Sequence, residues 1–488
     1  MRTTHNYLFL SDLHLSEGVN PHTGKLDRNE DFFYDLEFAQ LLVYHVNEWK
    51  KAKGDDPMAR PWKLCINGDI WDFLQVVSLP PDDHPIFTKY GVELTDNKRE
   101  YGLGTSEPET MWKLRRIAEG HPIFFQALGW FLAHEGFEVI LLKGNHDTEL
   151  YWQGVQEVTR HVIGEQYATW YKKMYEGALP DSPFAFRTNM PPKLEHLAQR
   201  IQFPPWFYYE PGLFYAEHGN QYDAANAYRN FLHPTVPDRP DLIELPSGSF
   251  FVRYFFNKIE ILHPFADNLR PLTRYVNWAL NSEPLDTLQL VFRNPRTLWK
   301  FFTSFTAKQV RQATLKQAVQ PAGKDDKTPL PLEEERRTAL HTLHDLYQAE
   351  GQSNSRRSLW QTALGVVART LAMVMALLGI RFFVLASYAF FAVAAVGVLI
   401  CYFIAAYLSR KLNDVENYVS LWNVSQNVQR VLNNEIAGQR AAVPFHIFGH
   451  DHHATFEELH DPHNPQPPSA NGMSTQAVGS PALAKPTG

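Results

Sequence analysis

Five short apolar runs along the chain each end in a polar turn, and this repeated pattern constrains the fold more than any other feature. Runs of this length, bounded by glycine and polar residues, predict buried strands. Helical stretches around residues 31–51 and 110–135 separate the first three runs. Strands that alternate with helices predict an α/β fold built on layered sheets. The apolar runs occupy residues 7–10, 62–66, 137–142, 212–216 and 445–448.

The turns that follow these runs carry carboxylate, imidazole and amide side chains. One such turn is weak evidence, because an Asp-x-His or Gly-Asp sequence often occurs by chance. Five in succession are stronger evidence, because ligand groups gather at the carboxyl ends of strands in sheets of this class. We therefore expect these side chains to meet at one polar site. In chain order they are Asp12 and His14, then Asp69, then Asn145, His146 and Asp147, then His218, and last His450 and His452.

The spacing of the turns indicates a large insertion. Intervals of 57, 76 and 73 residues separate Asp12, Asp69, Asn145 and His218, whereas 232 residues separate His218 from His450. We therefore expect the catalytic unit to comprise residues 1–235 and 443–460. The remaining predicted units are a mostly helical insertion or cap at residues 236–355, a transmembrane helical hairpin at residues 356–411, a return helix at residues 412–442 and a disordered tail at residues 461–488.

The transmembrane prediction rests on residues 382–408, which are 27 residues without a charge. Extension back to residue 370 gives 39 residues that include only one charged side chain, Arg381. A buried core helix is the alternative, but core helices of this length and uniformity are rare. A helix of that length would measure about 58 Å, and one crossing needs about 30 Å. We therefore expect two crossings in a hairpin, or a re-entrant or membrane-lying helix pair.

The topology of this segment follows from the residues on either side of it. Asp12 precedes the run and His450 follows it, so the number of crossings must be even if both serve one site. Positive residues at 356–357 and 410–411 flank the run and favour a cytoplasmic position for both ends. The N-terminus shows no signal-peptide pattern, and two cysteines fit a reducing compartment. The expected location is the inner (cytoplasmic) membrane, multi-pass, with the catalytic domain facing the cytosol.

The ordered set D-x-H, G-D, G-N-H-D, a strand-end H-G and G-H-x-H resembles that of the calcineurin-like metallophosphoesterase superfamily, over residues 6–225 and 443–453. The resemblance implies a two-sheet α/β sandwich, here with a helical insertion and a transmembrane hairpin. It implies two divalent metal ions, for which carboxylate, imidazole and amide ligands favour Mn, Fe, Zn or Mg, with Mn preferred. The implied ligands are Asp12, His14 and His452 for the first metal, Asn145, His218 and His450 for the second, and Asp69 as the bridge.

The same resemblance assigns catalytic roles. His146 would bind no metal, and would instead stabilise developing charge and donate a proton to the leaving oxygen. Asp147 is the candidate to orient His146, and a metal-bridging hydroxide would be the nucleophile. Asp72 is either a supporting residue of the site or part of a solvated turn. Three glycines precede ligands where the backbone must turn sharply and pass close to the metals, namely Gly68, Gly144 and Gly449.

The function expected from these features is that of a membrane-anchored phosphoesterase that hydrolyses a phosphodiester, phosphomonoester or pyrophosphate bond. Membrane anchoring makes membrane lipid a partner, and the substrate is a phosphorylated compound, lipid-linked or a nucleotide. The motifs resemble both enzymes that cleave UDP-diacylglucosamine, which commonly have Arg at the position of His146, and cyclic-nucleotide phosphodiesterases. The net charge of −7 favours no specific nucleic-acid partner. The alternative is a non-catalytic membrane scaffold or sensor, which predicts a broken ligand motif; all five motifs are intact.

Overall fold

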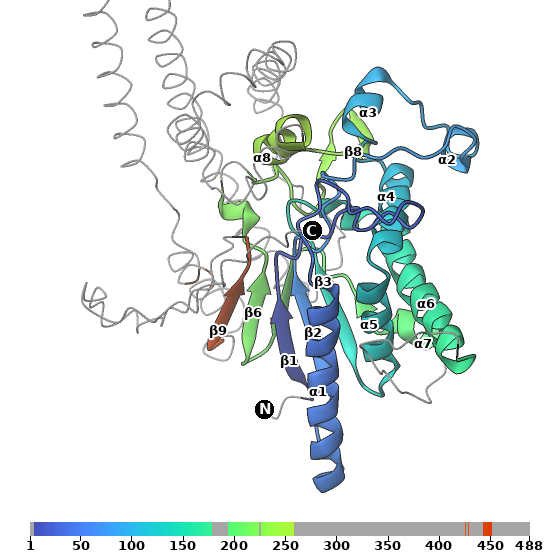
Figure 1. Ribbon diagram of the computed structural model, residues 1–488. Coiled ribbons are helices and arrows are strands. Elements are labelled where there is room, and N and C mark those ends of the chain that lie inside the picture. The colour runs from blue at the N-terminus through green and yellow to red at the C-terminus, as the bar shows by residue number, and fades with distance from the viewer. Residues whose placement is uncertain are drawn as a thin grey trace, which may run out of the picture.

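The computed structural model describes residues 4–177, 194–223, 226–257, 425, 428 and 443–450, which form a mixed α/β structure with three sheets (Figure 1). The predicted α/β class is confirmed, and all five predicted strands are present. A parallel sheet has the order β1-β2-β3-β4, a mixed sheet the order β5-β6-β9, and a two-stranded antiparallel sheet pairs β7 with β8. The strands are β1 (Asn6–Leu10), β2 (Trp62–Asn67), β3 (Glu138–Leu142), β4 (Ile201–Gln202), β5 (Phe207–Glu210), β6 (Phe214–Glu217), β7 (Thr235–Val236), β8 (Arg239–Ile243) and β9 (Phe445–Phe448).

Helices fill the connections between these strands. The stretch expected to be one helix at residues 110–135 is two helices, α4 and α5, because Pro122 lacks the amide hydrogen that would continue the first. The α-helices are α1 (Asp35–Asp55), α2 (Pro85–Thr88), α3 (Asp96–Tyr101), α4 (Glu107–Gly120), α5 (Pro122–Ala133), α6 (Gln153–Tyr175), α7 (Leu194–Gln199) and α8 (Ser247–Phe251). Short 3-10 turns η1 (Thr148–Tyr151) and η2 (Asn220–Tyr222) and a π-helical turn η3 (Val252–Phe256) complete the set.

The parallel sheet is buried on both faces, which explains its continuous apolar runs. On β2, Leu64 and Ile66 join the core formed with α1 and α5, whereas Cys65 points to the opposite face. There Cys65 packs with Phe214 and Ala216 of β6, so the second sheet covers the first. The described chain is therefore layered as helices, parallel sheet and mixed sheet (Figure 1).

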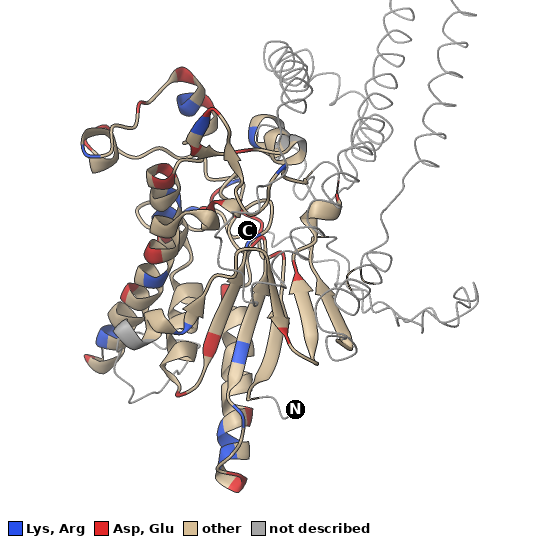
Figure 2. Cartoon of the chain, turned by 180° about the vertical axis from the view of Figure 1, so that it is seen from behind, with Lys and Arg blue, Asp and Glu red and all other residues tan. Residues whose placement is uncertain are grey.

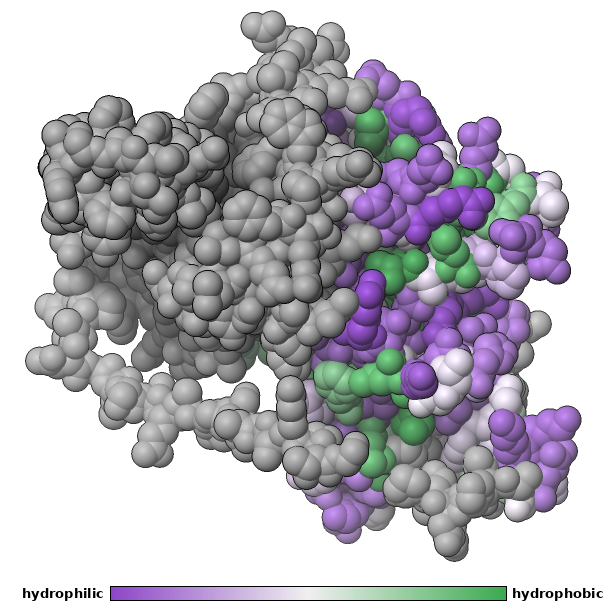
Figure 3. Space-filling model, turned by 45° about the horizontal axis from the view of Figure 1, so that its top comes forward, coloured by the Kyte–Doolittle hydropathy of each residue, from purple (hydrophilic) through white to green (hydrophobic). Residues whose placement is uncertain are grey.

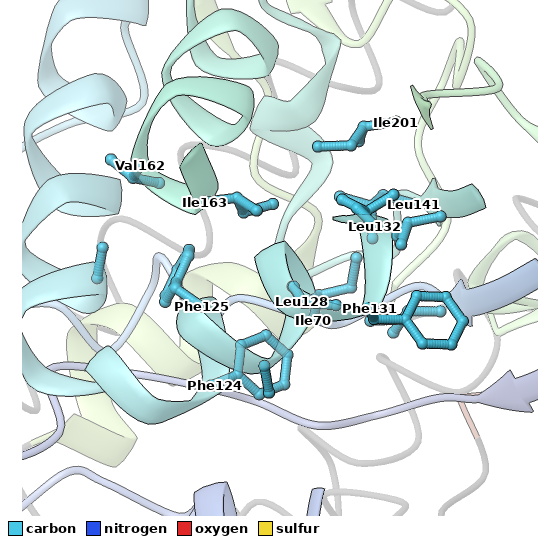
Figure 4. Packing of buried hydrophobic residues seen from close by; sticks show 14 of the residues in the cluster. Ile70, Phe124, Phe125, Leu128, Phe131, Leu132, Leu141, Val162, Ile163 and Ile201 are labelled. Carbon is cyan, nitrogen blue, oxygen red and sulfur yellow. The ribbon is translucent and has the colours of Figure 1, made fainter. Parts of the chain in front are cut away.

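Helix α5 supplies the centre of the helical layer. Its sequence is almost wholly apolar, and its side chains meet those of β3 and α6, as Figure 4 shows. A helix that is apolar all round is expected where both sides are covered, and α5 packs against both α1 and α6. The residues labelled in Figure 4 from α5 are Phe124, Phe125, Leu128, Phe131 and Leu132, and those around them are Ile70, Leu141, Val162, Ile163 and Ile201.

Charged residues in the described chain lie mainly on helices and loops, and most strand positions carry none (Figure 2). The face of the molecule shown in Figure 3 is largely hydrophilic where it is described, with small separate hydrophobic patches. This distribution agrees with the burial of the apolar strand residues between layers.

Strand β9 comes from far along the chain and joins the sheet formed by β5 and β6. It pairs in parallel with β6, with Tyr215 opposite His446 and Glu217 opposite Phe448.

None of the described helices is long and apolar enough to cross a membrane. The predicted hairpin at residues 356–411 lies outside the described residues, as do the tail, His452, most of the predicted cap and nearly all of the return helix.

A buried ion-paired histidine ties the loop after β1 to two helices. The side chain of His121 is 2% exposed, and its Nδ1 and Nε2 lie 2.9 Å from Asp35 Oδ2 and 3.0 Å from Glu30 Oε2. Glu30 also accepts hydrogen bonds from the backbone amides of Ser16 and Gly18. Burial alone would lower the pKa of His121, but the hydrogen bonds to Asp35 and Glu30 outweigh it and raise the pKa to about 9. The protonated ring therefore stabilises the loop that leads away from Asp12 and His14.

We expect the stability contributed by His121 to depend on pH. Its folded-state pKa of about 9 lies above the ordinary value of 6.5, so the stabilisation is complete below pH 6.5 and lost as pH rises through 9. The difference in unfolding free energy between the wild type and His121→Gln should shrink by about 3 kcal/mol between pH 6 and pH 9.5. Urea unfolding at a series of pH values measures it, and a difference independent of pH would contradict the assignment.

Candidate metal centre

The ends of five strands meet at one edge of the two large sheets, and hydrogen bonds join the turns that follow them. The amide of Asp12 donates to Gly68 O at 3.2 Å, and that of His14 donates to Asp69 O at 2.9 Å. The amide of His450 donates to the carboxylate of Asp12 at 3.0 Å. Turns that are hundreds of residues apart in sequence therefore form one continuous site, as the strand pattern predicts.

The carboxylate of Asp69 lies at the centre of this site. Asp69 is fully buried, and its Oδ2 lies 3.1 Å from His218 Nε2 and 3.8 Å from His14 Nε2. Its Oδ1 accepts a hydrogen bond from the backbone amide of His146 at 2.8 Å. Two groups of potential metal ligands have donor atoms within 4.8 Å of one another, His14–Asp69–His146 and Asp69–His218–His450. Asp69 belongs to both groups, so one carboxylate lies within reach of both sets of histidines.

The backbone is strained at four of the predicted ligands. Asp12, His14, Asp69 and His450 have φ angles of 55°, 51°, 49° and 74°, and they are the non-glycine residues with positive φ in the described part of the chain. Each such left-handed residue costs roughly 1 kcal/mol or more and persists where the surrounding structure holds it in place. The coincidence of strain with the ligand set indicates that these turns are built to place side chains.

Glycine is required at the three positions where the sequence predicted close approach. A Cβ atom on Gly68 would lie 2.5 Å from the ring of His218, and one on Gly144 would lie 2.2 Å from Asp69 Oδ1. A Cβ on Gly449 would collide with the loop after β1 in the same way. Real Cβ atoms do not come this close to other heavy atoms. The absence of side chains here lets the ligand-bearing turns pack directly against one another.

The amide side chain of Asn145 is buried without a hydrogen-bond partner. Asn145 is 1% exposed, and neither Oδ1 nor Nδ2 finds a partner among the described residues. Its backbone, by contrast, is held firmly, since its carbonyl accepts from Tyr228 OH at 3.1 Å and from Ser249 Oγ at 3.3 Å. A buried amide left unpaired costs about 1–3 kcal/mol. An ion that takes the amide oxygen as a ligand would remove the part of that cost that belongs to the oxygen.

The charges of the site favour a bound cation. Burial raises the pKa of Asp69, but the charges of His218 and His146 outweigh it and hold the pKa well below its ordinary value. Burial lowers the pKa of His14, but the hydrogen bond to Asp72 and the charge of Asp69 raise it to about 10. The charge of Asp69 likewise outweighs burial at His218 and raises its pKa to about 9. Protonated imidazoles thus compensate the negative charge of the carboxylates, and bound divalent cations can compensate it in their place.

Asp72 is the residue that orients His146. It is fully buried, and its Oδ2 lies 2.6 Å from His146 Nδ1 and 3.3 Å from His14 Nδ1. The burial of Asp72 excludes the solvated turn that was one of its two expected positions, and agrees with a supporting residue of the site. A charge-assisted hydrogen bond of this length fixes both the ring plane of His146 and the nitrogen that faces the site.

Asp147, the predicted partner of His146, has a different position. Its Oδ1 accepts from the amide of Gly144 at 2.6 Å and its Oδ2 from the amide of Ile70 at 2.7 Å. Burial and the nearby charge of Asp69 raise the pKa of Asp147 to about 7. The side chain therefore joins the loops after β2 and β3, and the orienting role expected of it falls to Asp72.

Eight of the nine predicted site residues lie in the described chain, and all eight gather at this edge; His452 lies outside it. The sequence did not single out Asp223, whose carboxylate lies 3.1 Å from His450 Nε2. No motif marks it, because it stands five residues beyond His218 in an ordinary turn.

Comparisons of the chain with protein-family models, with curated proteins and with solved structures find no match.

We expect Gly144→Ala to disturb the site through Asp69. The new methyl group would displace a fully buried carboxylate, at a cost of about 1–3 kcal/mol in unfolding free energy and a loss of Mn²⁺ affinity. Gly54→Ala is the matched control, because a Cβ at Gly54 meets nothing within 4 Å. Thermal unfolding and isothermal titration with Mn²⁺ measure both effects, and a Gly144→Ala protein with wild-type stability and affinity would contradict this packing.

Proposed function

We propose that the chain is a phosphoesterase with a dinuclear metal centre, of the calcineurin-like metallophosphoesterase type. The observation that carries the proposal is the shared position of Asp69, which belongs to both groups of potential ligands. Two metals that act together in hydrolysis lie about 3.5–4 Å apart and need a carboxylate able to bridge them. The arrangement of a helical layer, a parallel sheet and a mixed sheet, with the site at the strand ends, supports the two-sheet sandwich of that superfamily.

The donor atoms present fit such a pair of ions. Carboxylate and imidazole donors surround Asp69, the unpaired amide of Asn145 adds a neutral oxygen, and the described cysteine, Cys65, lies away from the site between the sheets. This donor set favours Mn, Fe, Zn or Mg, with Mn preferred. Asp12, His14 and His452 would hold one ion, and Asn145, His218 and His450 the other. His146 lies in the same group of potential ligands as His14 and Asp69, and we assign it to proton donation instead of metal binding.

The bound metals supply Lewis-acid activation of water and of the phosphoryl oxygens. His146 supplies the proton. Its Nδ1 donates to Asp72 at 2.6 Å, which leaves Nε2 to protonate the leaving oxygen. Water adds to phosphorus and gives up one proton to the solvent, from which His146 regains a proton after the product leaves. The bond from phosphorus to the leaving oxygen breaks, and that oxygen takes the proton from His146. His146 and Asp72 are 3% and 0% exposed, so this transfer is shielded from bulk water.

We also propose that the apolar segment at residues 356–411 anchors the enzyme to the inner membrane as a hairpin, with the catalytic unit on the cytosolic side. The contact between Asp12 and His450 supports an even number of crossings, because residues before and after the segment meet at one site. A phosphorylated substrate that is lipid-linked, or a nucleotide, suits an enzyme held at a membrane surface.

We expect His146→Ala to lose hydrolysis of bis-p-nitrophenyl phosphate or p-nitrophenyl phosphate by about 10²–10⁴-fold while it still binds two Mn²⁺ ions. His161→Ala is the control, because that histidine is exposed on α6 with a single surface ion pair to Glu165. Turnover and metal content are measured on the same preparations. Unchanged turnover would remove the proposed role, and loss of one metal would make His146 a ligand. A wild type that binds metal without turnover on any phosphoester would favour the scaffold or sensor.

The hairpin proposal predicts that labels at residue 1 and residue 488 react from the same side of the membrane. In membrane vesicles of known orientation, both labels should be accessible on the cytosolic face. Labels that react on opposite faces would mean an odd number of crossings, and a chain found wholly in the soluble fraction would contradict the anchor.

A further inference from the structure

The turn after β6 carries a carboxylate that contacts a ligand brought by β9. Asp223 follows η2, and its Oδ2 lies 3.1 Å from Nε2 of His450. The side chain of His450 is 5% exposed and that of Asp223 is 34% exposed. This contact joins residues 227 positions apart in the chain. Asp223 therefore holds the one described ligand that reaches the site from beyond the long insertion.

Local hydrogen bonds fix Asp223. Its Oδ2 accepts from Asn226 Nδ2 at 2.7 Å, and its carbonyl accepts from the amides of Asn226 and Ala227 at 3.0 and 2.8 Å. Its own amide donates to Asn220 O at 3.2 Å. The turn thus places the carboxylate independently of β9, in position to receive the ring of His450.

The other two histidine ligands within the described chain are supported through the opposite ring nitrogen. Nδ1 of His218 donates to Asn67 O at 2.9 Å, and Nδ1 of His14 lies 3.3 Å from Asp72. In both rings Nε2 is the nitrogen nearest Asp69, at 3.1 Å and 3.8 Å. A metal-binding histidine usually donates its second ring N–H to a carboxylate or carbonyl, which fixes the tautomer and orients the ring. In His450 the supported nitrogen is Nε2.

We propose that Asp223 is a positioning residue of the metal centre: it accepts the Nε2–H of His450 and so leaves Nδ1 as the nitrogen that binds the ion. This inference rests on the proposed dinuclear centre. It distinguishes His450 from His14 and His218, which present Nε2. Loss of such a supporting partner costs about 10–100-fold in metal affinity.

The test is Mn²⁺ binding to the full-length chain after removal of metal with chelator. In the wild type we expect two bound ions. In Asp223→Ala we expect one site to weaken by about 10–100-fold and the other to keep its affinity. In Asp223→Asn the amide oxygen still accepts the Nε2–H, so we expect affinity to return most of the way to that of the wild type. Asp241→Asn is the control, because Asp241 pairs with Arg239 on the exposed strand β8.

A double-mutant cycle separates positioning from other roles. If Asp223 acts through His450, Asp223→Ala adds no further loss of affinity to a His450→Ala protein. Additive losses would overturn the proposal, as would wild-type affinity in Asp223→Ala or equal weakening of both sites with a lowered melting temperature. Should Asp223→Ala not fold, Asp223→Ser replaces it, since a hydroxyl is too short to reach His450 but keeps a polar group at this partly exposed position.

The same titration distinguishes failure of the inference from failure of the proposed function. Two bound ions in a wild type without phosphoester hydrolysis would contradict the function and leave the comparison of the Asp223 variants decisive. A wild type that binds no Mn²⁺ would overturn both. Two ions, turnover and an Asp223→Ala protein with unchanged affinities would overturn the inference alone.

Discussion

The buried carboxylate of Asp69 is the constraint on which the rest of the site depends. A fully buried carboxylate is stable only if cations and hydrogen-bond donors surround it. Here the rings of His14 and His218 and the backbone amide of His146 supply that environment, and they come from three different strand ends. The turns after β1, β3 and β6 are therefore held in one arrangement around the turn after β2. Strand β9 completes it, since the amide of His450 reaches Asp12.

Unfavourable local conformations are concentrated at the site, and packing elsewhere in the fold offsets their free-energy cost. In the part of the chain that the structure describes, four left-handed non-glycine residues and a buried amide without a described partner are unfavourable in isolation. They persist because a large core holds the strands behind them, with α5 between α1 and α6 and the second sheet on the opposite face. Proteins commonly break local rules at functional sites and compensate in the scaffold. The concentration of such exceptions at one sheet edge is typical of a functional site.

The sequence predicted five of the strands and their turns because each apolar run is short and ends in a polar turn. It missed the break at Pro122 between α4 and α5, where helical periodicity continues across a residue that cannot donate a hydrogen bond. It also missed four strands. Of these, β4, β7 and β8 are short or mostly exposed and carry little pattern. The fourth, β5, is mostly buried but has only four residues. Among site residues, the strand-end motifs predicted the candidate ligands but not the residues that support them. Whether Asp72, Asp147 or Asp223 reaches a given ring depends on turn geometry, which neighbouring sequence does not encode in a simple motif.

The most direct test of the account is the metal dependence of phosphoester hydrolysis by the purified full-length chain. After chelation, we predict that hydrolysis of bis-p-nitrophenyl phosphate or p-nitrophenyl phosphate disappears and returns with Mn²⁺, saturating at two ions per chain. The preferred substrate would separate diester from monoester chemistry. A chain that binds fewer than two ions at saturation, or that hydrolyses these esters equally well without metal, would contradict a centre in which Asp69 serves two ions.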